Sequence, residues 1–163
     1  MRKIFKSISA LKKELEKIRT DNGPVVLANG CFDVIHAGHV RYLEEAAGLG
    51  ELLVVAVNND DSTRSLKGAG RPVFPEEERA EIIAALRAVD YVLIFGDATV
   101  DNILLELRPD IHAKGTDYTP EKVPEKKTAE SIGCRTVITG DPKDHSSRDI
   151  IDSIAGRDRF GSV

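Results

Sequence analysis

Five short apolar runs alternate with helical patterns along this chain of 163 residues, and this alternation constrains the fold more than any other feature. The apolar runs indicate strands at residues 25–28, 52–57, 91–95, 111–113 and 135–139. The segments between and around them indicate helices at residues 9–19, 38–47, 76–86, 100–107, 127–131 and 148–155. Continuous apolar strands are typical of parallel sheets buried on both faces, and crossovers between parallel strands are right-handed.

These elements predict one α/β domain of Rossmann-like architecture, with a parallel five-stranded sheet in the order 3-2-1-4-5 and helices on both faces. We expect an N-terminal helix at residues 1–23, a main domain at 24–156 and a C-terminal tail at 157–163. In such sheets ligands bind beyond the carboxyl ends of the strands, where the strand order reverses. Functional residues are therefore expected in the loops that follow the strands.

The composition excludes several classes of protein. Hydrophobic residues make up 41% and charged residues 31%, a balance typical of soluble globular proteins. No apolar run approaches the roughly 18 residues of a membrane helix, and the N-terminus lacks the apolar core of a signal peptide. We therefore expect a cytoplasmic protein without membrane contact. A net charge of −4 argues against a nucleic-acid partner, and Cys31 and Cys134 form no disulfide or metal-binding pattern.

The loop after the first strand, residues 29–39, carries the most informative motif. His36 and His39 flank Gly38 at the start of a helix. Unpaired N–H groups at a helix N-terminus attract phosphate, and two imidazoles there can donate hydrogen bonds to phosphate oxygens in a transition state. Two alternatives are that the histidines only cap the helix, or that they bind a metal ion together with Asp33.

Residues 58–72, between the second strand and the next helix, form a second candidate region. We interpret this stretch as a loop that can close over phosphates with Arg64, Lys67 or Arg71. The alternative is that these cations are merely solvated. Arg79, in the helix that follows, is a further candidate, with a structural ion pair as its alternative.

Two later segments are the remaining candidate regions for ligand binding. If the first and fourth strands are neighbours, residues 114–118 face the histidines, so that Gly115 can admit a nucleotide and Asp117 can contact its ribose or base. Hydroxyl groups in residues 144–148, before the last helix, can either cap that helix or bind a phosphate.

These motifs resemble those of the nucleotidyltransferases with an H-x-G-H signature. Residues 29–43, 66–72 and 114–118 look most like the adenylyltransferase half of the bifunctional heptose-phosphate kinases and adenylyltransferases, here standing alone. The resemblance covers residues 24–154. It implies AMP transfer from ATP to a heptose 1-phosphate, giving ADP-heptose for surface polysaccharide, with Mg²⁺ bound to ATP and no metal ligand from the protein. It also implies a homodimer or a larger homo-oligomer.

The resemblance assigns roles to individual residues. It implies catalytic roles for His36, His39 and Lys67. The implied nucleotide-binding residues are Gly30, Cys31, Phe32, Asp33, Gly38, Lys114, Gly115, Asp117, Ser146 and Ser147. The implied acceptor-binding residues are Asn58, Lys67, Arg71 and Arg79. One departure is Arg148, which stands where the family usually has a threonine.

Three other functions fit parts of the pattern. A cytidylyltransferase acting on glycerol 3-phosphate would use the same chemistry, but Lys67 with Gly68 and residues 114–118 favour the heptose branch. A nucleotide-binding sensor without turnover is disfavoured because His36, His39 and Lys67 are all present. A fragment of an aminoacyl-tRNA synthetase is disfavoured by the acidic charge and by the lack of a tRNA-binding extension.

Overall fold

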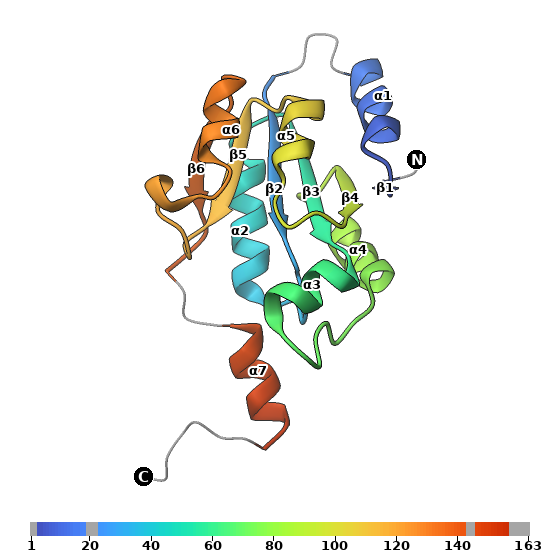
Figure 1. The fold of residues 1–163 in the computed structure, drawn as a ribbon, viewed down its shortest axis with the longest axis vertical. Coiled ribbons are helices and arrows are strands. Elements are labelled where there is room, and N and C mark those ends of the chain that lie inside the picture. Colours follow the sequence, from blue (N-terminus) through green and yellow to red (C-terminus); the bar gives the residue numbers. More distant parts are fainter. Residues whose placement is uncertain (1–2, 19–22, 143–145, 157–163) are drawn as a thin grey trace.

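The computed structural model describes residues 3–18, 23–142 and 146–156, which build a six-stranded sheet with helices on both faces (Figure 1). The strands are β1 (Ile4–Phe5), β2 (Val25–Gly30), β3 (Leu52–Asn58), β4 (Tyr91–Phe95), β5 (Ile111–Gly115) and β6 (Arg135–Thr139). Their order across the sheet is β1-β4-β3-β2-β5-β6, and all neighbouring strands are parallel. The predicted α/β class with a parallel sheet is confirmed.

The prediction of five strands in the order 3-2-1-4-5 is wrong, because it lacks β1. Counted without β1, the other strands run β4-β3-β2-β5-β6 across the sheet. In β1, Ile4 pairs with Val92 and Phe5 pairs with Leu93 of β4. A strand of two residues has no periodic pattern of its own, so only its pairing with β4 identifies it.

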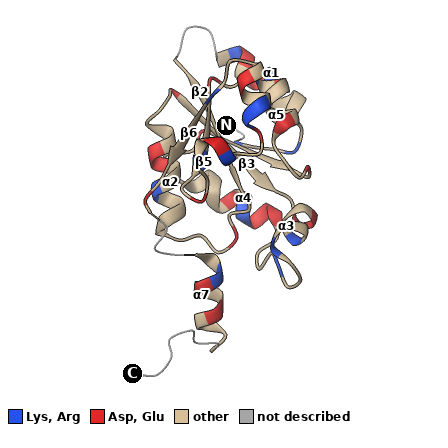
Figure 2. Ribbon diagram, turned by 60° about the vertical axis from the view of Figure 1, so that its left-hand side comes forward, with Lys and Arg blue, Asp and Glu red and all other residues tan. Residues whose placement is uncertain are grey.

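Six of the seven α-helices begin and end within one residue of the predicted positions, where the chain is described. The helices are α1 (Ile8–Ile18), α2 (Ala37–Ala47), α3 (Asp60–Lys67), α4 (Glu76–Ala85), α5 (Asp101–Leu107), α6 (Lys126–Ser131) and α7 (Ser147–Ile154), with a 3₁₀ turn η1 (Pro120–Lys122). None of these described helices is both long enough and apolar enough to span a bilayer. Charged residues of both signs are spread over the helices (Figure 2).

Helix α3 corrects the prediction of a loop at residues 58–72. The Asn59 side chain caps the helix by accepting a hydrogen bond from the Ser62 N–H at 2.9 Å. Gly68 ends it with a φ of 95°, a conformation that favours glycine. The sequence pattern did not predict this helix because its residues, apart from Leu66, are polar and show no apolar periodicity. Its caps and its packing stabilise it instead.

The helices cover two separate apolar cores, one on each face of the sheet. Helices α1, α5 and α6 pack on the first face, and α2 and α4 pack on the second. Successive strand residues alternate between the cores, so that Leu27 of β2 lies in the first and Val26 in the second. Helices α3 and α7 lie at the carboxyl ends of the strands (Figure 1).

The predicted segment boundaries at residues 23 and 156 stay a prediction. Leu11 and Leu15 of α1 are buried in the first core together with residues of α5. The segment at residues 3–18 therefore packs on the same sheet as the main domain. The predicted tail at residues 157–163 lies outside the described residues.

Candidate active site

The two histidines of the H-x-G-H motif lie together at the start of α2. His36 is the N-cap, and its Nδ1 accepts a hydrogen bond from the Gly38 N–H at 3.2 Å. The Nδ1 of His39 accepts from the His36 N–H at 3.4 Å, and the ring centroids are 4.0 Å apart. Each Nδ1 thus accepts a backbone N–H group, so capping, one of the alternatives above, is present at the start of α2.

Gly38 keeps the space beside the His36 ring open. A Cβ atom added at Gly38 would lie only 3.0 Å from Cε1 and Nδ1 of the His36 ring. A side chain there would push the His36 ring away from the backbone N–H that it caps. Glycine at this position therefore lets the first histidine cap the helix.

The loop that leads to the histidines has an unusual backbone. Phe32 and Val34 have φ values of 49° and 57°, in the left-handed region that residues with a Cβ rarely occupy. The buried Phe32 ring stacks on Tyr42, with centroids 6.4 Å apart, and meets His39 edge-on at 5.5 Å. The Tyr42 hydroxyl, in turn, donates to the Ala113 carbonyl at 2.9 Å. Packing against α2 and β5 thus holds the loop in this strained form.

Asp33 connects this loop to the segment after α3. Its carboxylate is buried and accepts a hydrogen bond from the Arg71 Nε at 2.6 Å. It also accepts from the backbone N–H groups of Val73 and Phe74 at 2.9 and 3.2 Å. These contacts engage the carboxylate, and the predicted role of Asp33 in nucleotide binding stays a prediction. The structure gives no support to the metal alternative, since no group of three metal-ligating side chains occurs among the described residues.

Arg79 is fully buried and acts as an internal anchor. Its guanidinium donates to the backbone carbonyls of Phe74, Cys31 and Asn58 at 2.9, 2.6 and 2.7 Å. It also pairs with the Asp60 carboxylate at 2.8 Å. The structural ion pair that was the alternative for Arg79 is present, and its predicted role in acceptor binding stays a prediction.

Asn58, at the end of β3, is buried as well. Its Nδ2 donates to the Ser62 Oγ at 3.2 Å, and its Oδ1 accepts from the Cys31 thiol at 3.9 Å. Both ends of the amide thus have protein partners. Asn58 and Arg71 are therefore placed beside the site, but as parts of its framework.

Lys67, the last residue of α3, is in a different situation. It is exposed and makes no hydrogen bond or ion pair with the described part of the chain. Gly68 and Gly70, which follow, have positive φ values of 95° and 80° and open space around them. The segment is therefore positioned to let the lysine approach an anionic ligand, and its predicted catalytic role stays a prediction.

Lys114 lies under the carboxyl edge of the sheet, near the end of β5. It is buried, pairs with the buried Glu125 carboxylate at 3.3 Å and donates to the Asn29 Oδ1 at 3.3 Å. Its ammonium also lies 4.7 Å from the centre of the Tyr118 ring, a cation–π contact. Burial lowers the pKa of Lys114, and the Glu125 carboxylate opposes that shift. The predicted role of Lys114 in nucleotide binding stays a prediction.

His112, also on β5, was not singled out from the sequence. Its side chain is fully buried, and its Nε2 lies 3.0 Å from the Asn29 Oδ1. Burial and the nearby Lys114 charge lower the pKa of His112 to about 3, against a smaller opposing effect from Asp101. The imidazole is therefore neutral at physiological pH.

The remaining predicted residues lie in the surrounding loops. Gly115 and Asp117 follow at the end of β5, where a Cβ at Gly115 would meet no atom within 4 Å. Ser146 is the N-cap of α7 and accepts from the Asp149 N–H at 3.1 Å. Ser147 donates to the Val34 carbonyl at 3.3 Å, which brings the start of α7 to the histidine loop. Asp144 and His145, also considered above, lie outside the described residues.

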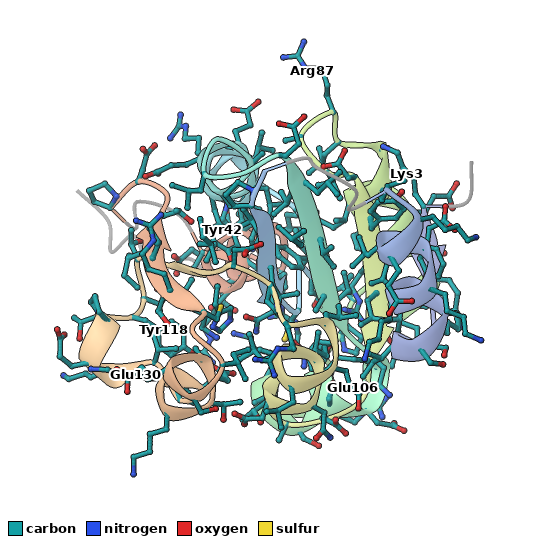
Figure 3. The ribbon with its side chains drawn as sticks, turned by 90° about the horizontal axis from the view of Figure 1, so that it is seen from above. Lys3, Tyr42, Arg87, Glu106, Tyr118 and Glu130 are labelled. Atoms are coloured by element: carbon teal, nitrogen blue, oxygen red, sulfur yellow. The ribbon has the colours of Figure 1, made fainter. Side chains whose placement is uncertain are left out.

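The structure thus brings the histidine loop together with the carboxyl ends of β3 and β5 and with the start of α7. Sequence reasoning gave no role to the side chains of Asn29, His112, Glu125 and Tyr118, although Asn29 and Tyr118 lie in segments named above for their motifs. Figure 3 shows Tyr118 and Arg87 on different sides of the molecule, with Arg87 extending away from the body. The signal for Asn29 was its place in residues 29–43, a segment that carried the resemblance without giving this side chain a role.

Relatives of this chain are bifunctional proteins. It is 46% identical over 148 residues to "Bifunctional protein HldE" of Syntrophotalea carbinolica, covering 91% of this chain and 30% of that protein. It is 42% identical over 150 residues to the protein of that name from Desulfatibacillum aliphaticivorans, covering 92% and 31%. The chain therefore spans about a third of the length of these relatives.

Solved structures share the fold. A lipopolysaccharide core biosynthesis protein from Thermoplasma volcanium superposes with a TM-score of 0.63 at 29% identity, covering 74% of this chain and 99% of that one. A pantothenate synthetase from Thermus thermophilus gives a TM-score of 0.66 at 16% identity, covering 91% and 67%, and thus supports the fold alone. The family model named cytidylyltransferase-like matches residues 27–153. These matches support nucleotidyltransferase activity, and the chain belongs to the cytidylyltransferase-like family.

Proposed function

We propose that this chain transfers AMP from ATP to a heptose 1-phosphate, giving an ADP-heptose and pyrophosphate. The observation that carries the proposal is the pair of histidines whose ring centroids lie 4.0 Å apart at the N-terminus of α2. Two imidazoles beside a helix N-terminus suit an α-phosphate that gains negative charge in the transition state. The identity to proteins named HldE supports the choice of substrates.

The reaction is an in-line displacement at the α-phosphorus of ATP. An oxygen of the acceptor phosphate forms the new P–O bond while the bond between the α-phosphorus and the bridging oxygen breaks, and that electron pair leaves with pyrophosphate. The acceptor is already an anion, so no general base is needed, and catalysis depends on positioning and charge stabilisation.

The residues that this scheme uses lie at the start of α2, the end of α3, the end of β5 and the start of α7. His36 and His39 stabilise the α-phosphate, and Lys67 moves toward both phosphates from its exposed position at the end of α3. Ser146 and Ser147 bind the terminal phosphates at the start of α7. Gly115 and Asp117 contact the nucleoside.

Mg²⁺ enters this proposal as a partner of ATP. Asp33, the carboxylate of the histidine loop, is engaged by Arg71 and two backbone N–H groups. The triphosphate would therefore supply the metal's anionic ligands. When bound, Mg²⁺ neutralises phosphate charge. We further propose that the enzyme works in the cytoplasm as a homodimer or a larger homo-oligomer.

Pyrophosphate release with Mg²⁺ tests the proposal, with ATP and CTP each crossed against heptose 1-phosphate and glycerol 3-phosphate. We expect turnover with ATP and the heptose phosphate, and its loss in His39→Ala. Turnover with CTP and glycerol 3-phosphate would instead keep the mechanism and overturn the substrates. If the pyrophosphate signal does not depend on any acceptor, transfer to a sugar phosphate is excluded.

A further inference from the structure

Asn29 presents its side chain at the carboxyl edge of the sheet, on the face opposite to α2. It lies near the end of β2, two residues after Leu27, which packs in the core under α1, α5 and α6. Side chains two residues apart on a strand point to the same face. The histidines, in contrast, begin α2, which covers the other face.

Two donors from β5 determine how the Asn29 amide is turned. The Nζ of Lys114 and the Nε2 of His112 both meet the same Asn29 atom, at 3.3 and 3.0 Å. An ammonium group can only donate, so the atom that it meets must be the amide oxygen. The Nδ2 group of Asn29 therefore points away from both donors.

The Nδ2 group is available to a ligand. It makes no hydrogen bond with any residue in the described ranges, and it is not among the buried atoms left without a partner. The side chain is partly exposed, so Nδ2 reaches solvent. Asn58, on the neighbouring strand, differs in that its Nδ2 already donates to Ser62.

We propose that the Asn29 amide binds the acceptor, by donating from Nδ2 to a hydroxyl or phosphate oxygen of the sugar phosphate. This inference rests on the proposed function. In an in-line displacement the acceptor and the leaving pyrophosphate lie on opposite sides of the α-phosphorus. If the nucleotide phosphates bind at the start of α2, the acceptor phosphate approaches from the opposite side. The Asn29 Nδ2 group, on the other face of the sheet, is then in position to donate to the acceptor. Lys114 and His112 then act as positioning residues for Asn29.

Two variants of Asn29 test the contact. Asn29→Asp keeps the oxygen that Lys114 and His112 meet but has no N–H, and Asn29→Ala removes the whole amide. We expect the KM for the sugar phosphate to rise about tenfold in both, the size of one lost hydrogen bond to a polar or charged group. The KM for ATP and the thermal midpoint should stay near wild type. Asn102→Asp, at an exposed position on α5, is the matched control and should change neither KM.

The positioning role has a separate test. Removing Lys114 alone would leave the Glu125 carboxylate buried without its partner, so the double variant Lys114→Met/Glu125→Gln removes both charges. We expect it to raise the KM for the sugar phosphate by about threefold to tenfold, because Asn29 loses a donor that orients it. Combined with Asn29→Ala, it should raise that KM no further. Additive effects would overturn the positioning role.

The outcomes separate this inference from the proposed function. An unchanged KM for the sugar phosphate in Asn29→Ala, with an active wild type, overturns the inference and leaves the function intact. A rise in the KM for ATP alone assigns the amide to the nucleotide and overturns the acceptor contact. A wild type without turnover on any acceptor overturns the function, and the inference fails with it.

Discussion

The start of α2 and the end of α3 carry the predicted catalytic residues in opposite ways. We call residues 35–39 the histidine turn and residues 64–70 the lysine segment. In the histidine turn, both imidazoles accept backbone hydrogen bonds and lie against Phe32 or each other. In the lysine segment, Lys67 is exposed and bonded to no other residue of the described chain.

This difference matches two demands of phosphoryl transfer. Groups that stabilise the transition state work best when they are already oriented, because no reorganisation is then needed during the reaction. A group that draws two anionic substrates together must let them enter first, which favours a mobile cation that closes afterwards. We therefore expect substitutions in the histidine turn to act on kcat, and those in the lysine segment to act more evenly on kcat and KM.

The largest effect should come from His36→Asn, which separates capping from chemistry. Asparagine is a good N-cap, so it preserves the acceptor for the Gly38 N–H but removes the imidazole. We expect kcat to fall by roughly 10³-fold, as for other lost transition-state donors, with little change in the thermal midpoint. Wild-type kcat in this variant would mean that His36 serves only as a cap.

Arg79→Met tests whether the two regions depend on one anchor. The substitution leaves the carbonyls of Cys31, Asn58 and Phe74 buried without their donor. We expect the free energy of unfolding to fall by about 3 kcal/mol or more, measured by urea denaturation. Arg87→Met is the control, since Arg87 extends away from the body (Figure 3), and it should change stability by less than about 0.5 kcal/mol. Equal losses in the two variants would show that Arg79 is no anchor.

Lys67→Ala tests the role of the exposed lysine in the lysine segment. We expect kcat/KM to fall by roughly 30- to 100-fold, because one charged contact to phosphate is lost, while the thermal midpoint stays the same. The matched control is Lys127→Ala, at an exposed position on α6, which should keep full activity. A large loss of stability in Lys67→Ala would contradict the picture of an unbonded side chain.

The smallest effect concerns stability at acidic pH, which should depend on His112, the buried residue that contacts Asn29. The pKa of His112 is about 3 in the fold and about 6.5 in an unfolded chain. Between these values the unfolded state binds the extra proton, so stability is lost as the pH falls. We expect His112 to cost about 2 kcal/mol of stability between pH 7 and pH 5.

Denaturant melts at the two pH values measure this cost, with His112→Gln as the comparison. The variant should lose less stability on acidification than the wild type. Lys114 and Asp101, whose charges act on the pKa of His112, are the same in both proteins. Identical slopes would contradict the buried neutral imidazole.

Most helices and strands could be predicted because each carries a local pattern. The exceptions are β1, which has two residues, and α3, whose residues are polar except Leu66. For the site, the H-x-G-H motif placed His36 and His39 correctly at the start of α2, because helix capping is a local interaction. Arg79 and Asp33 have motif positions like those of ligand-binding residues, and only their burial shows that they hold the framework.

The sequence by itself determined the alternation of strands and helices, the parallel sheet and the histidine pair, since all of these follow from neighbours within a few residues. Only the tertiary structure decided how the polar side chains are divided between framework and site. The two donors to Asn29 come from residues that lie 83 and 85 positions further along the sequence. Arg71 is separated from Asp33 by 38 positions. Burial and hydrogen-bond partners at such separations depend on how the strands and loops pack, which no local pattern encodes.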